Sequence, residues 1–375
     1  MDSHTGEIPR NWTGLEQLEA NGQFDHDMTD PEAGVPGAPR WSIVIIARNE
    51  EANIEACLRS VLEAFEGRDA EIVLVDSAST DRTVKIARRF PVRVICLPPS
   101  KHLNPSIGRA TGFARTRGRT VLFLDGDCIL ERDWVELAER ALDADTTLGG
   151  VAGASHGLLP PGPDGKRRTQ DEYPNADYDN PSFLAGSAAY RRAVLENVGC
   201  FNPNLYACEE EEFGARVRKG GYRMRRLRET MSQHHPKNAK ETTSELIRRL
   251  RRRYFIGLGQ LVRQTFAHEL PITGAVASVS RHLVYFSVLM LGVLSGIASV
   301  AATSLVPLGL WLLLMSSAFT LFAVKSRSVT KPAYYFLEWT LASPMVVWGL
   351  ALPPLAAEWR RPGLEPTVVH EPTDR

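Results

Sequence analysis

Blocks of apolar and polar residues alternate along the first half of the chain, and the blocks differ in length and spacing. Short, nearly continuous apolar runs are typical of buried strands, whereas apolar residues at every third or fourth position are typical of amphipathic helices. This pattern predicts strands at 42–47, 71–76, 92–97 and 120–125, and helices at 50–65, 79–90, 106–116 and 131–143. Strands that alternate with helices of this length predict an α/β fold with a doubly wound, mostly parallel sheet.

The pattern of apolar and polar residues becomes less regular between residues 158 and 264. Residues 158–182 are rich in Pro, Gly, Asp and Asn and are expected to form a long surface loop. Helical spacing resumes at 188–197 and 209–219, and 222–227 has the composition of a last strand. Residues 241–264 are expected to form one basic helix.

That basic helix carries an arginine cluster at positions 248, 249, 251, 252 and 253, followed by Tyr254. The cluster has the charge to bind a diphosphate or a polyprenyl phosphate. It can equally rest on anionic lipid head groups, and this is the simpler interpretation.

A long uncharged segment follows. Positions 283–324 contain no charged residue, and as one helix these 42 positions would be about 63 Å long, roughly twice a bilayer core. Two crossings with a turn near 303–307 are therefore expected. A third apolar stretch, 333–357, is interrupted by Glu338 and ends near two prolines. It can be a third crossing or a bent segment at the membrane interface.

The distribution of charge predicts that the N-terminal folded part lies in the cytoplasm. Residues 1–39 are polar, lack an apolar core and are expected to be a disordered leader rather than a signal peptide. Lys325, Arg327 and Lys331 lie between the second and third apolar stretches, and the first turn is uncharged, so we expect a multi-pass protein of the inner (plasma) membrane. Arg360 and Arg361 disagree with this orientation if the third stretch crosses.

Two other bulk properties limit the function. Lys+Arg and Asp+Glu both number 44, so no overall positive charge favours nucleic acid as a partner. The five cysteines show no metal-binding spacing and fit reduced thiols in a cytoplasmic domain.

Candidate chemistry begins with Asp125-Gly126-Asp127, at the end of the strand predicted at 120–125. In open α/β sheets, ligands bind at the carboxyl ends of the strands. Two carboxylates so close repel each other unless a cation lies between them, and carboxylate oxygens suit Mg²⁺ or Mn²⁺ bound to a substrate diphosphate.

With these elements in order, the chain resembles the family 2 glycosyltransferases, which have the GT-A fold. The likeness covers about residues 41–255 and rests on four motifs: Ile45-Ile46-Ala47-Arg48-Asn49-Glu50-Glu51, Val75-Asp76-Ser77-Ala78-Ser79-Thr80-Asp81-Arg82-Thr83, Phe123-Leu124-Asp125-Gly126-Asp127, and Glu209-Glu210-Glu211-Glu212-Phe213 followed by Arg216 and Gly221-Tyr222. The chain departs from the family pattern in having Ala47 where Pro is usual. It has no Gln-X-X-Arg-Trp motif downstream, which favours a single sugar addition over processive synthesis.

The resemblance implies a role for each candidate. Those expected to bind the nucleotide sugar are Ala47, Asn49, Glu50 and Asp76 at the nucleotide, Arg109 at the diphosphate, and Asp125 at the ribose or the metal. Asp127 is expected to ligate Mg²⁺ or Mn²⁺, and His234, in a His-His pair after the last strand, to complete the metal site.

The acidic run is expected to supply the catalytic base. Inverting transfer needs a carboxylate to accept the proton of the acceptor hydroxyl as that oxygen attacks the anomeric carbon. Alignment on Gly221-Tyr222 puts Glu210 at the base position, where the family usually has Asp, with Glu209 and Glu211 as substitutes. Crowded like charges should also raise one of these pKa values.

These inferences combine into one hypothesis: a membrane-anchored, metal-dependent, inverting glycosyltransferase that moves a sugar from a nucleotide-sugar donor to a lipid-linked or glycan acceptor. The alternatives are a nucleotidyltransferase, which typically has a Gly-rich basic loop after strand one, and a non-catalytic membrane scaffold. The expected division of the chain is a leader (1–39), a GT-A catalytic domain (40–240), a basic juxtamembrane segment (241–280), a transmembrane region of two to three helices (281–358) and a tail (359–375).

Overall fold

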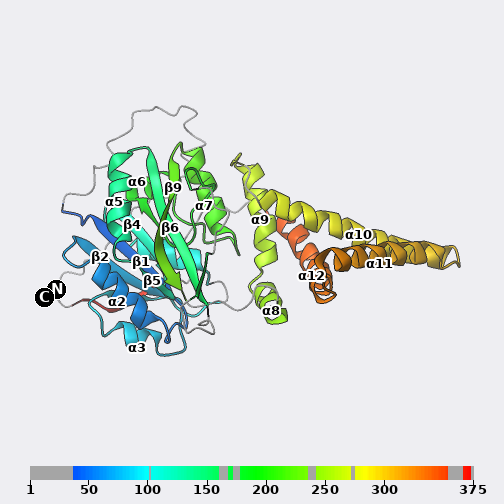
Figure 1. The fold of residues 1–375 in the computed structure, drawn as a ribbon, viewed down its shortest axis with the longest axis horizontal. Coiled ribbons are helices and arrows are strands. Elements are labelled where there is room, and N and C mark those ends of the chain that lie inside the picture. The colour runs from blue at the N-terminus through cyan, green and yellow to red at the C-terminus, as the bar shows by residue number, and fades with distance from the viewer. Residues whose placement is uncertain are drawn as a thin grey trace. The chain divides into compact units, whose positions relative to one another are not determined.

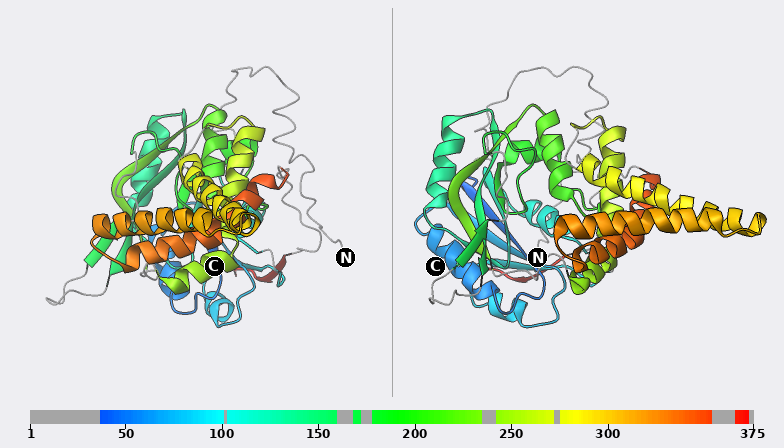
Figure 2. Two further views of the ribbon diagram at one scale, coloured as in Figure 1. Left: turned by 90° about the vertical axis from the view of Figure 1, so that its right-hand side faces the viewer. Right: turned by 45° about the vertical axis from the view of Figure 1, so that its right-hand side comes forward.

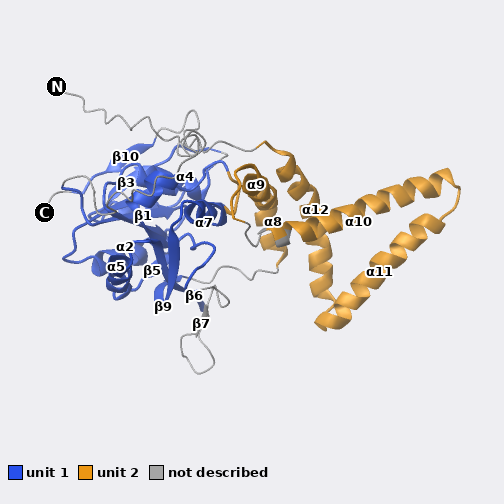
Figure 3. Ribbon diagram, turned by 90° about the horizontal axis from the view of Figure 1, so that it is seen from above, with its two compact units in different colours: residues 1–204, 209–236, 355–375 blue, residues 205–208, 237–354 orange. Residues whose placement is uncertain are grey.

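The computed structural model of the chain describes residues 37–100, 103–159, 168–171, 178–234, 242–271, 275–353 and 366–372. These residues fall into two compact units, coloured separately in Figure 3. The first unit takes its described residues from 1–204, 209–236 and 355–375, and the second from 205–208 and 237–354. The leader expected at 1–39 lies outside the described residues except for 37–39.

The first unit is built on a mixed ten-stranded sheet (Figure 1). Its strands are β1 (Trp41–Ala47), β2 (Ala70–Asp76), β3 (Arg93–Cys96), β4 (Thr120–Asp125), β5 (Cys128–Leu130), β6 (Leu148–Leu159), β7 (Arg168–Asp171), β8 (Ala188–Arg191), β9 (Arg223–His234) and β10 (Thr367–His370). They lie in the order β10-β3-β2-β1-β4-β8-β6-β9-β5, and β7 pairs with β6. The α/β fold is thus confirmed; strands β3, β2, β1 and β4 are parallel as predicted, whereas the sheet as a whole is mixed.

Helices connect these strands as the periodicity predicts. They are α2 (Ile54–Ala64), α3 (Thr83–Ala87), α4 (Pro105–Phe113), α5 (Trp134–Ala144), α6 (Arg192–Val198) and α7 (Glu209–Lys219). The apolar side of α2, with Ile54, Leu58 and Val61, is fully buried, as expected for the inward stripe of an amphipathic helix. The parallel strands β1 and β4 are buried along their central residues, which explains their continuous apolar sequence.

The chain reverses its direction of progress across the sheet at β1. Strands β2 and β3 are added in parallel on one side of β1, and β4 is added in parallel on the other. The carboxyl ends of β1 and β4 therefore lie at a topological switch point, the usual location of a ligand crevice in sheets of this type.

Helix α4 packs unusually closely on β1 because two of its residues are glycines. A Cβ added at Gly108 would lie 2.9 Å from Cγ2 of Ile46, and one added at Gly112 would lie 2.2 Å from Cγ1 of Val44. The two glycines, one helical turn apart, let the helix backbone approach the strand. Arg109, between them, is thereby held beneath the carboxyl end of the sheet.

Several elements differ from the sequence prediction. Residues 188–197 are not one helix: 188–191 form β8 between β4 and β6, and only 192–198 are helical. Alanine is uncommon in strands, so Ala188 and Ala189 do not predict one. The strand forms because this segment is buried between β4 and β6. The loop predicted at 158–182 contains the end of β6 and the short strand β7. Strand β9, which includes the strand predicted at 222–227, is twice the predicted length.

The second unit is helical. It contains α8 (Thr243–Arg251), α9 (Tyr254–Ala267), α10 (Ala275–Ala301), α11 (Val306–Ser326) and α12 (Thr330–Ala351). The single basic helix predicted at 241–264 is therefore two helices, with Arg253 in the left-handed region (φ 57°) at the break. In α10 and α11, the segments Val279–Ala301 and Val306–Ser326 are long and apolar enough to cross a membrane.

The C-terminal segment returns to the first unit. Strand β10, dark red in the two views of Figure 2, pairs antiparallel with β3 at the edge of the sheet. Periodicity does not predict this strand, because four residues in a polar tail are too few to show a period.

Candidate active site

The predicted nucleotide-binding residues meet at one edge of the sheet. Ala47, the last residue of β1, is the register partner of Asp76, the last residue of β2. On the other side of β1, Ile46 is the partner of Asp125 at the end of β4. The motifs at the ends of β1, β2 and β4 thus lie next to one another at the switch point.

Hydrogen bonds join the loops that follow β1 and β2. The Asn49 backbone N–H donates to Oγ of Ser79 at 2.8 Å, and the Asn49 side-chain oxygen accepts from the Thr80 N–H at 2.8 Å. The Glu50 N–H donates to Oγ1 of Thr83 at 2.8 Å. Asn49 has φ 57°, a conformation that asparagine tolerates better than most residues. Asn49 therefore helps to join the loops after β1 and β2, which together we call the rim. Its contact with the nucleotide stays a prediction.

Asp76 lies just below the same rim. Its side chain is buried and accepts hydrogen bonds from the backbone N–H and the hydroxyl of Ser79. Burial raises the pKa of Asp76 above its ordinary value, although the Ser79 hydrogen bonds oppose the rise. The carboxyl thus stabilises the turn after β2. Its hydrogen bond to the nucleotide base stays a prediction and would be formed in addition to these contacts.

The Asp125-Gly126-Asp127 turn is fixed against β1. The Gly126 N–H donates to the carbonyl of Ile46 at 2.8 Å, and a Cβ at Gly126 would lie 3.0 Å from that of Ala47. The Cys128 thiol contacts Oδ1 of Asp127 at 3.7 Å. A side chain in place of this glycine would therefore crowd β1, and the glycine lets the turn lie close to that strand.

His234 is brought to this turn by the long strand β9. It ends β9 and is the register partner of Cys128, the residue after Asp127. Its ring is buried. The sheet thus brings the predicted metal ligands Asp125, Asp127 and His234 into one region, although the histidine is more than 100 positions from the two acids in sequence.

The donor set fits a divalent cation that shares its ligands with a substrate. Among the described residues, no three His, Cys, Asp or Glu side chains gather closely enough to hold a metal by themselves. Mg²⁺ is commonly held by one or two carboxylates together with substrate phosphates, rather than by a complete protein cage. Asp127, with Asp125 or His234, supplies such a partial set.

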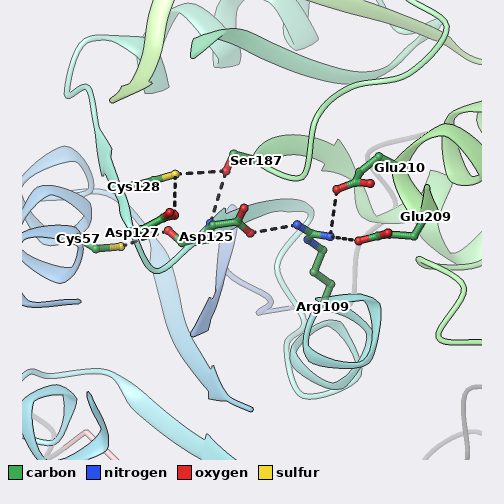
Figure 4. Close-up of polar contacts among 8 residues, drawn as sticks. All are labelled: Cys57, Arg109, Asp125, Asp127, Cys128, Ser187, Glu209 and Glu210. Carbon is green, nitrogen blue, oxygen red and sulfur yellow. Dashed lines mark hydrogen bonds and ion pairs between the residues drawn. The ribbon is translucent and has the colours of Figure 1, made fainter. Parts of the chain in front are cut away.

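Arg109 connects this turn to the acidic run (Figure 4). Its side chain is only 2% exposed. Its guanidinium lies 3.0 Å from Asp125, 3.3 Å from Glu209 and 3.6 Å from Glu210, and it sits over the ring of Phe201 with 5.0 Å between Cζ and the ring centroid. Because one buried guanidinium faces three carboxylates, loss of the arginine would leave buried negative charge without a partner, whereas loss of one carboxylate still leaves the guanidinium paired.

The four consecutive glutamates of α7 have different surroundings. Glu212 is buried and forms a two-pronged ion pair with Arg216, which also donates to the carbonyls of Val198, Gly199 and Cys200. This pair anchors the helix. Glu209 is buried against Arg109.

Glu210 differs from its neighbours because it reaches both Arg109 and solvent. Its side chain is 26% exposed. Desolvation, followed by the charge of Glu209, raises the pKa of Glu210 well above 4.5, and Arg109 limits the rise. A carboxyl with a raised pKa and access to water has the properties of a general base.

Gly186 is a site residue whose contact with Arg109 the sequence did not predict. A Cβ at Gly186 would lie 2.1 Å from Nη2 of Arg109 and 3.2 Å from Oε1 of Glu210. Ser187, the next residue, accepts a hydrogen bond from the Asp125 backbone N–H at 3.4 Å. The segment before β8 therefore passes directly over the Arg109 cluster, and a lone glycine in an irregular region is no sequence signal of this.

Comparison with known proteins agrees with this geometry. The family model "Glycosyl transferase family 2" matches residues 42–199. Over 193 residues the chain is 27% identical to glycosyltransferase AglE of Haloferax volcanii, an alignment of 49% of this chain and 63% of that protein. It is 33% identical over 117 residues to the undecaprenyl-phosphate 4-deoxy-4-formamido-L-arabinose transferase of Pseudomonas paraeruginosa, covering 29% of this chain and 34% of the relative. The chain thus spans about a third to just under two thirds of these relatives.

Among solved structures, the fold is similar to that of the mannosyltransferase PcManGT from Pyrobaculum calidifontis in complex with GDP-Man and Mn²⁺. The TM-score is 0.50 at 22% sequence identity, over 90% of this chain and 93% of that protein. This likeness concerns the fold. Residues 42–199 therefore match the glycosyl transferase family 2 model, and the chain shares its fold with this solved structure.

Proposed function

We propose that the protein is a metal-dependent, inverting glycosyltransferase in which Glu210 is the general base. The observation that carries the proposal is the ion-pair cluster of Arg109 with Asp125 and the α7 glutamates. It joins the carboxylate at the end of β4 to the first turn of α7. A donor held at the β4 end and an acceptor approaching α7 would thus have their reacting atoms between these two elements.

In the proposed reaction, the acceptor hydroxyl transfers its proton to the Glu210 carboxylate while its oxygen bonds to the anomeric carbon of the donor sugar. The bond from that carbon to the diphosphate breaks on the opposite face, and the nucleoside diphosphate leaves with the electron pair. A single displacement of this kind inverts the anomeric centre. General base catalysis of this type typically contributes about 10²–10⁴ in rate.

The rim formed by the loops after β1 and β2 would bind the nucleotide. Ala47, Asn49, Glu50 and Asp76 border it, as the family resemblance implies. Asp127, with Asp125 and His234, would hold Mg²⁺ or Mn²⁺. A cation bound there would supply charge stabilisation to the leaving diphosphate.

Arg109 has a different role in this proposal from the diphosphate contact that the resemblance implies. Its guanidinium is buried and already faces three carboxylates. We assign it as a positioning residue that fixes the Glu210 side chain and limits the rise of its pKa. The Nε atom of Arg109 lacks a hydrogen-bond partner among the described residues, but it is buried as well and thus not directed to an open crevice.

The acceptor is proposed to be lipid-linked. Two helices of the second unit are long and apolar enough to cross a membrane, and the arginines near α8 can face anionic head groups. The similarity to a transferase that is named for undecaprenyl phosphate supports a polyprenyl phosphate as the acceptor class. Membrane anchoring would keep such an acceptor at the enzyme, with the catalytic unit in the cytoplasm.

A donor screen on the detergent-solubilised protein tests the proposal. Release of nucleoside diphosphate would be measured from UDP-, GDP- and dTDP-sugars, with Mn²⁺ or with EDTA, and with or without a polyprenyl phosphate. We expect release from one donor class, dependent on the metal and increased by the lipid. The anomeric configuration of the isolated product, read by NMR coupling constants, should be opposite to that of the donor.

The matched control separates the metal site from the fold. Asp127→Asn keeps the size of the side chain and should abolish metal-dependent turnover, whereas Asp143→Asn, at an exposed position on α5, should leave it unchanged. Undiminished turnover in Asp127→Asn, or a product with retained configuration, would overturn the corresponding part of the proposal.

A further inference from the structure

The chain enters and leaves its apolar helices from the same folded unit. Strand β10 adds to the edge of the catalytic sheet, with Thr367 opposite Cys96 and Val368 opposite Ile95. Glu371 forms an ion pair with Arg93 at 2.8 Å, and Val369 packs against the main core. Because a sheet cannot pair its strands across a bilayer, residues on both sides of the helical unit must lie on one side of the membrane.

This arrangement determines the parity of the crossings. Each crossing moves the chain to the other side, so the number between β9 and β10 must be even. A helix needs about 20 residues to cross. Helix α9 has 14 residues, and none of the segments that join these helices to one another or to β9 and β10 has more than 15, which leaves α10, α11 and α12. Two of these three helices can therefore cross, but not all three.

Helices α10 and α11 are the better pair. Neither contains an acidic or basic residue between 283 and 324, and no side chain of α11 is buried by the described part of the protein. They form a hairpin in which the Trp311 indole N–H donates to the Val288 carbonyl at 2.9 Å. The turn between them, 302–305, is uncharged.

Helix α12 packs most extensively on α9, and it also contacts α8 and the ends of the α10–α11 pair that lie near it. Glu338 is buried and forms an ion pair with Arg249 of α8 at 2.9 Å, so α12, unlike the uncharged stretch of α10 and α11, carries a charged residue in its middle. A Cβ at Gly349 would lie 2.2 Å from the carbonyl oxygen of Ile256, and one at Gly259 would lie 2.2 Å from that of Val346. Backbone contacts this close hold α12 to α9, a helix too short to cross.

One face of α12 remains uncovered and is apolar. Leu337, Leu341 and Trp348 are 46%, 43% and 58% exposed, and their spacing of four and seven residues puts them on one stripe. The buried residues Glu338, Ala342, Val346 and Gly349 lie on another side of the helix. An exposed apolar stripe beside a basic helix is the pattern of a helix that lies in a membrane interface.

We infer that α10 and α11 are the two crossings and that α12 lies in the plane of the membrane on the catalytic side, with its Leu337–Leu341–Trp348 stripe in the lipid leaflet. This inference rests on the proposal that the protein is an integral membrane protein, and it is independent of the sugar-transfer chemistry. It resolves the choice between two and three crossings that the sequence left open.

The distribution of charge agrees with this topology. With two crossings, every basic cluster that flanks the helices lies on the catalytic side: the arginines at 248–253, the residues Lys325, Arg327 and Lys331, and the pair at 360–361. The uncharged 302–305 turn is then alone on the far side. A third crossing would carry the 360–361 pair to the far side, against the usual asymmetry of short loops.

Cysteine labelling of the full-length protein in spheroplasts tests the topology. Four single variants at exposed positions would be treated with a membrane-impermeant maleimide before and after lysis: Glu66→Cys in the catalytic unit, Ala302→Cys, Val329→Cys and Thr367→Cys. The parent protein gives the background from its own cysteines, of which four are buried. We expect the variants at 66, 329 and 367 to react together, and Ala302→Cys to react from the opposite side.

Labelling of Thr367→Cys together with Ala302→Cys would show three crossings and overturn the inference, as would labelling of all four from one side. This readout needs no enzymatic activity. A protein that shows the expected labelling and no sugar transfer would contradict the proposed function alone, and the reverse result would contradict the topology alone.

Spin labels on α12 test the in-plane orientation separately. Labels at 337, 341 and 348, in vesicles of mixed zwitterionic and anionic lipids, should report one shallow depth of about 5–10 Å by accessibility to oxygen and to a water-soluble nickel complex. A crossing helix would instead change depth by about 1.5 Å per residue, or roughly 16 Å between the first and last labels. A graded depth of that size would refute the in-plane helix.

Discussion

The proposed base can be tested by a substitution that should slow the reaction and stabilise the fold at the same time. Glu210→Gln removes the carboxylate and keeps the shape of the side chain. If Glu210 accepts the acceptor's proton, turnover should fall by about 10²–10⁴. Because the role is in the chemical step, the fall should appear in kcat, with a smaller change in the KM for the donor.

The stability effect follows from the direction in which the fold moves the pKa. The pKa of Glu210 in the folded protein lies above its ordinary value of 4.5. Between these two values the folded state binds more protons than the unfolded state, so the free energy of unfolding decreases as pH rises through that window. A pKa difference of 1 between the folded and unfolded states corresponds to about 1.4 kcal/mol. Glutamine has no proton to lose, so the variant should be more stable than the parent above the window and should lose this advantage below pH 4.5.

Thermal unfolding and initial rates, measured on the same preparations over a range of pH, check both effects. For a domain of this size, about 1 kcal/mol corresponds to roughly 2–4 °C in Tm. In the parent, kcat should rise with pH through a value above 4.5, since the base must be ionised. Glu136→Gln, an exposed glutamate of α5, is the matched control and should change neither property. A Glu210→Gln variant with normal kcat would move the base to Glu209 or Glu211, and a variant less stable at alkaline pH would refute the pKa argument.

Two further substitutions test the surroundings of the site, and a pair of substitutions tests an ion pair of the helical unit. Arg109→Met should lower the free energy of unfolding by about 3 kcal/mol, because it leaves Glu209 as a buried charge without its partner, and should shift the kcat profile to higher pH; an unchanged profile would remove Arg109 from the positioning role. Gly186→Ala should reduce kcat about tenfold or more through displacement of Arg109, while Gly296→Ala, which has open space around it, should have no effect in the same assay. In the helical unit, Arg249→Met and Glu338→Gln should each destabilise, and a double-mutant cycle followed by thermal unfolding should give a coupling of about 0.5–3 kcal/mol; additive effects would show that the ion pair is not formed.

The periodicity of the sequence determined the α/β core and the order of its elements. The apolar runs 42–47, 71–76 and 120–125 appear as β1, β2 and β4 within a residue or two of the predicted bounds, because strands buried on both faces must be continuously apolar. The motifs at their ends identified which residues meet at the switch point, since parallel strands deliver their carboxyl ends to one edge.

Long-range packing decided what local pattern could not. The strand at 188–191 forms because it is inserted between β4 and β6, and its alanines carry no propensity that would reveal it. From the sequence, Arg109 could be identified only as a cation on a helix. Its ion pairs with Asp125 and two glutamates form because glycines let α4 approach β1 and because α7 lies at the same edge of the sheet.

The four glutamates illustrate the same division. Identical side chains at consecutive positions cannot be told apart by local pattern. Only the fold separates an anchor paired with Arg216, a buried partner of Arg109 and a partly exposed carboxyl with a raised pKa. Likewise, the composition of 333–357 permitted a crossing, and only the pairing of β10 with β3 supplies a parity argument against it. Local sequence determines which elements form and which groups are available, whereas contacts between distant residues determine how charge is compensated and on which side of a membrane the chain must end.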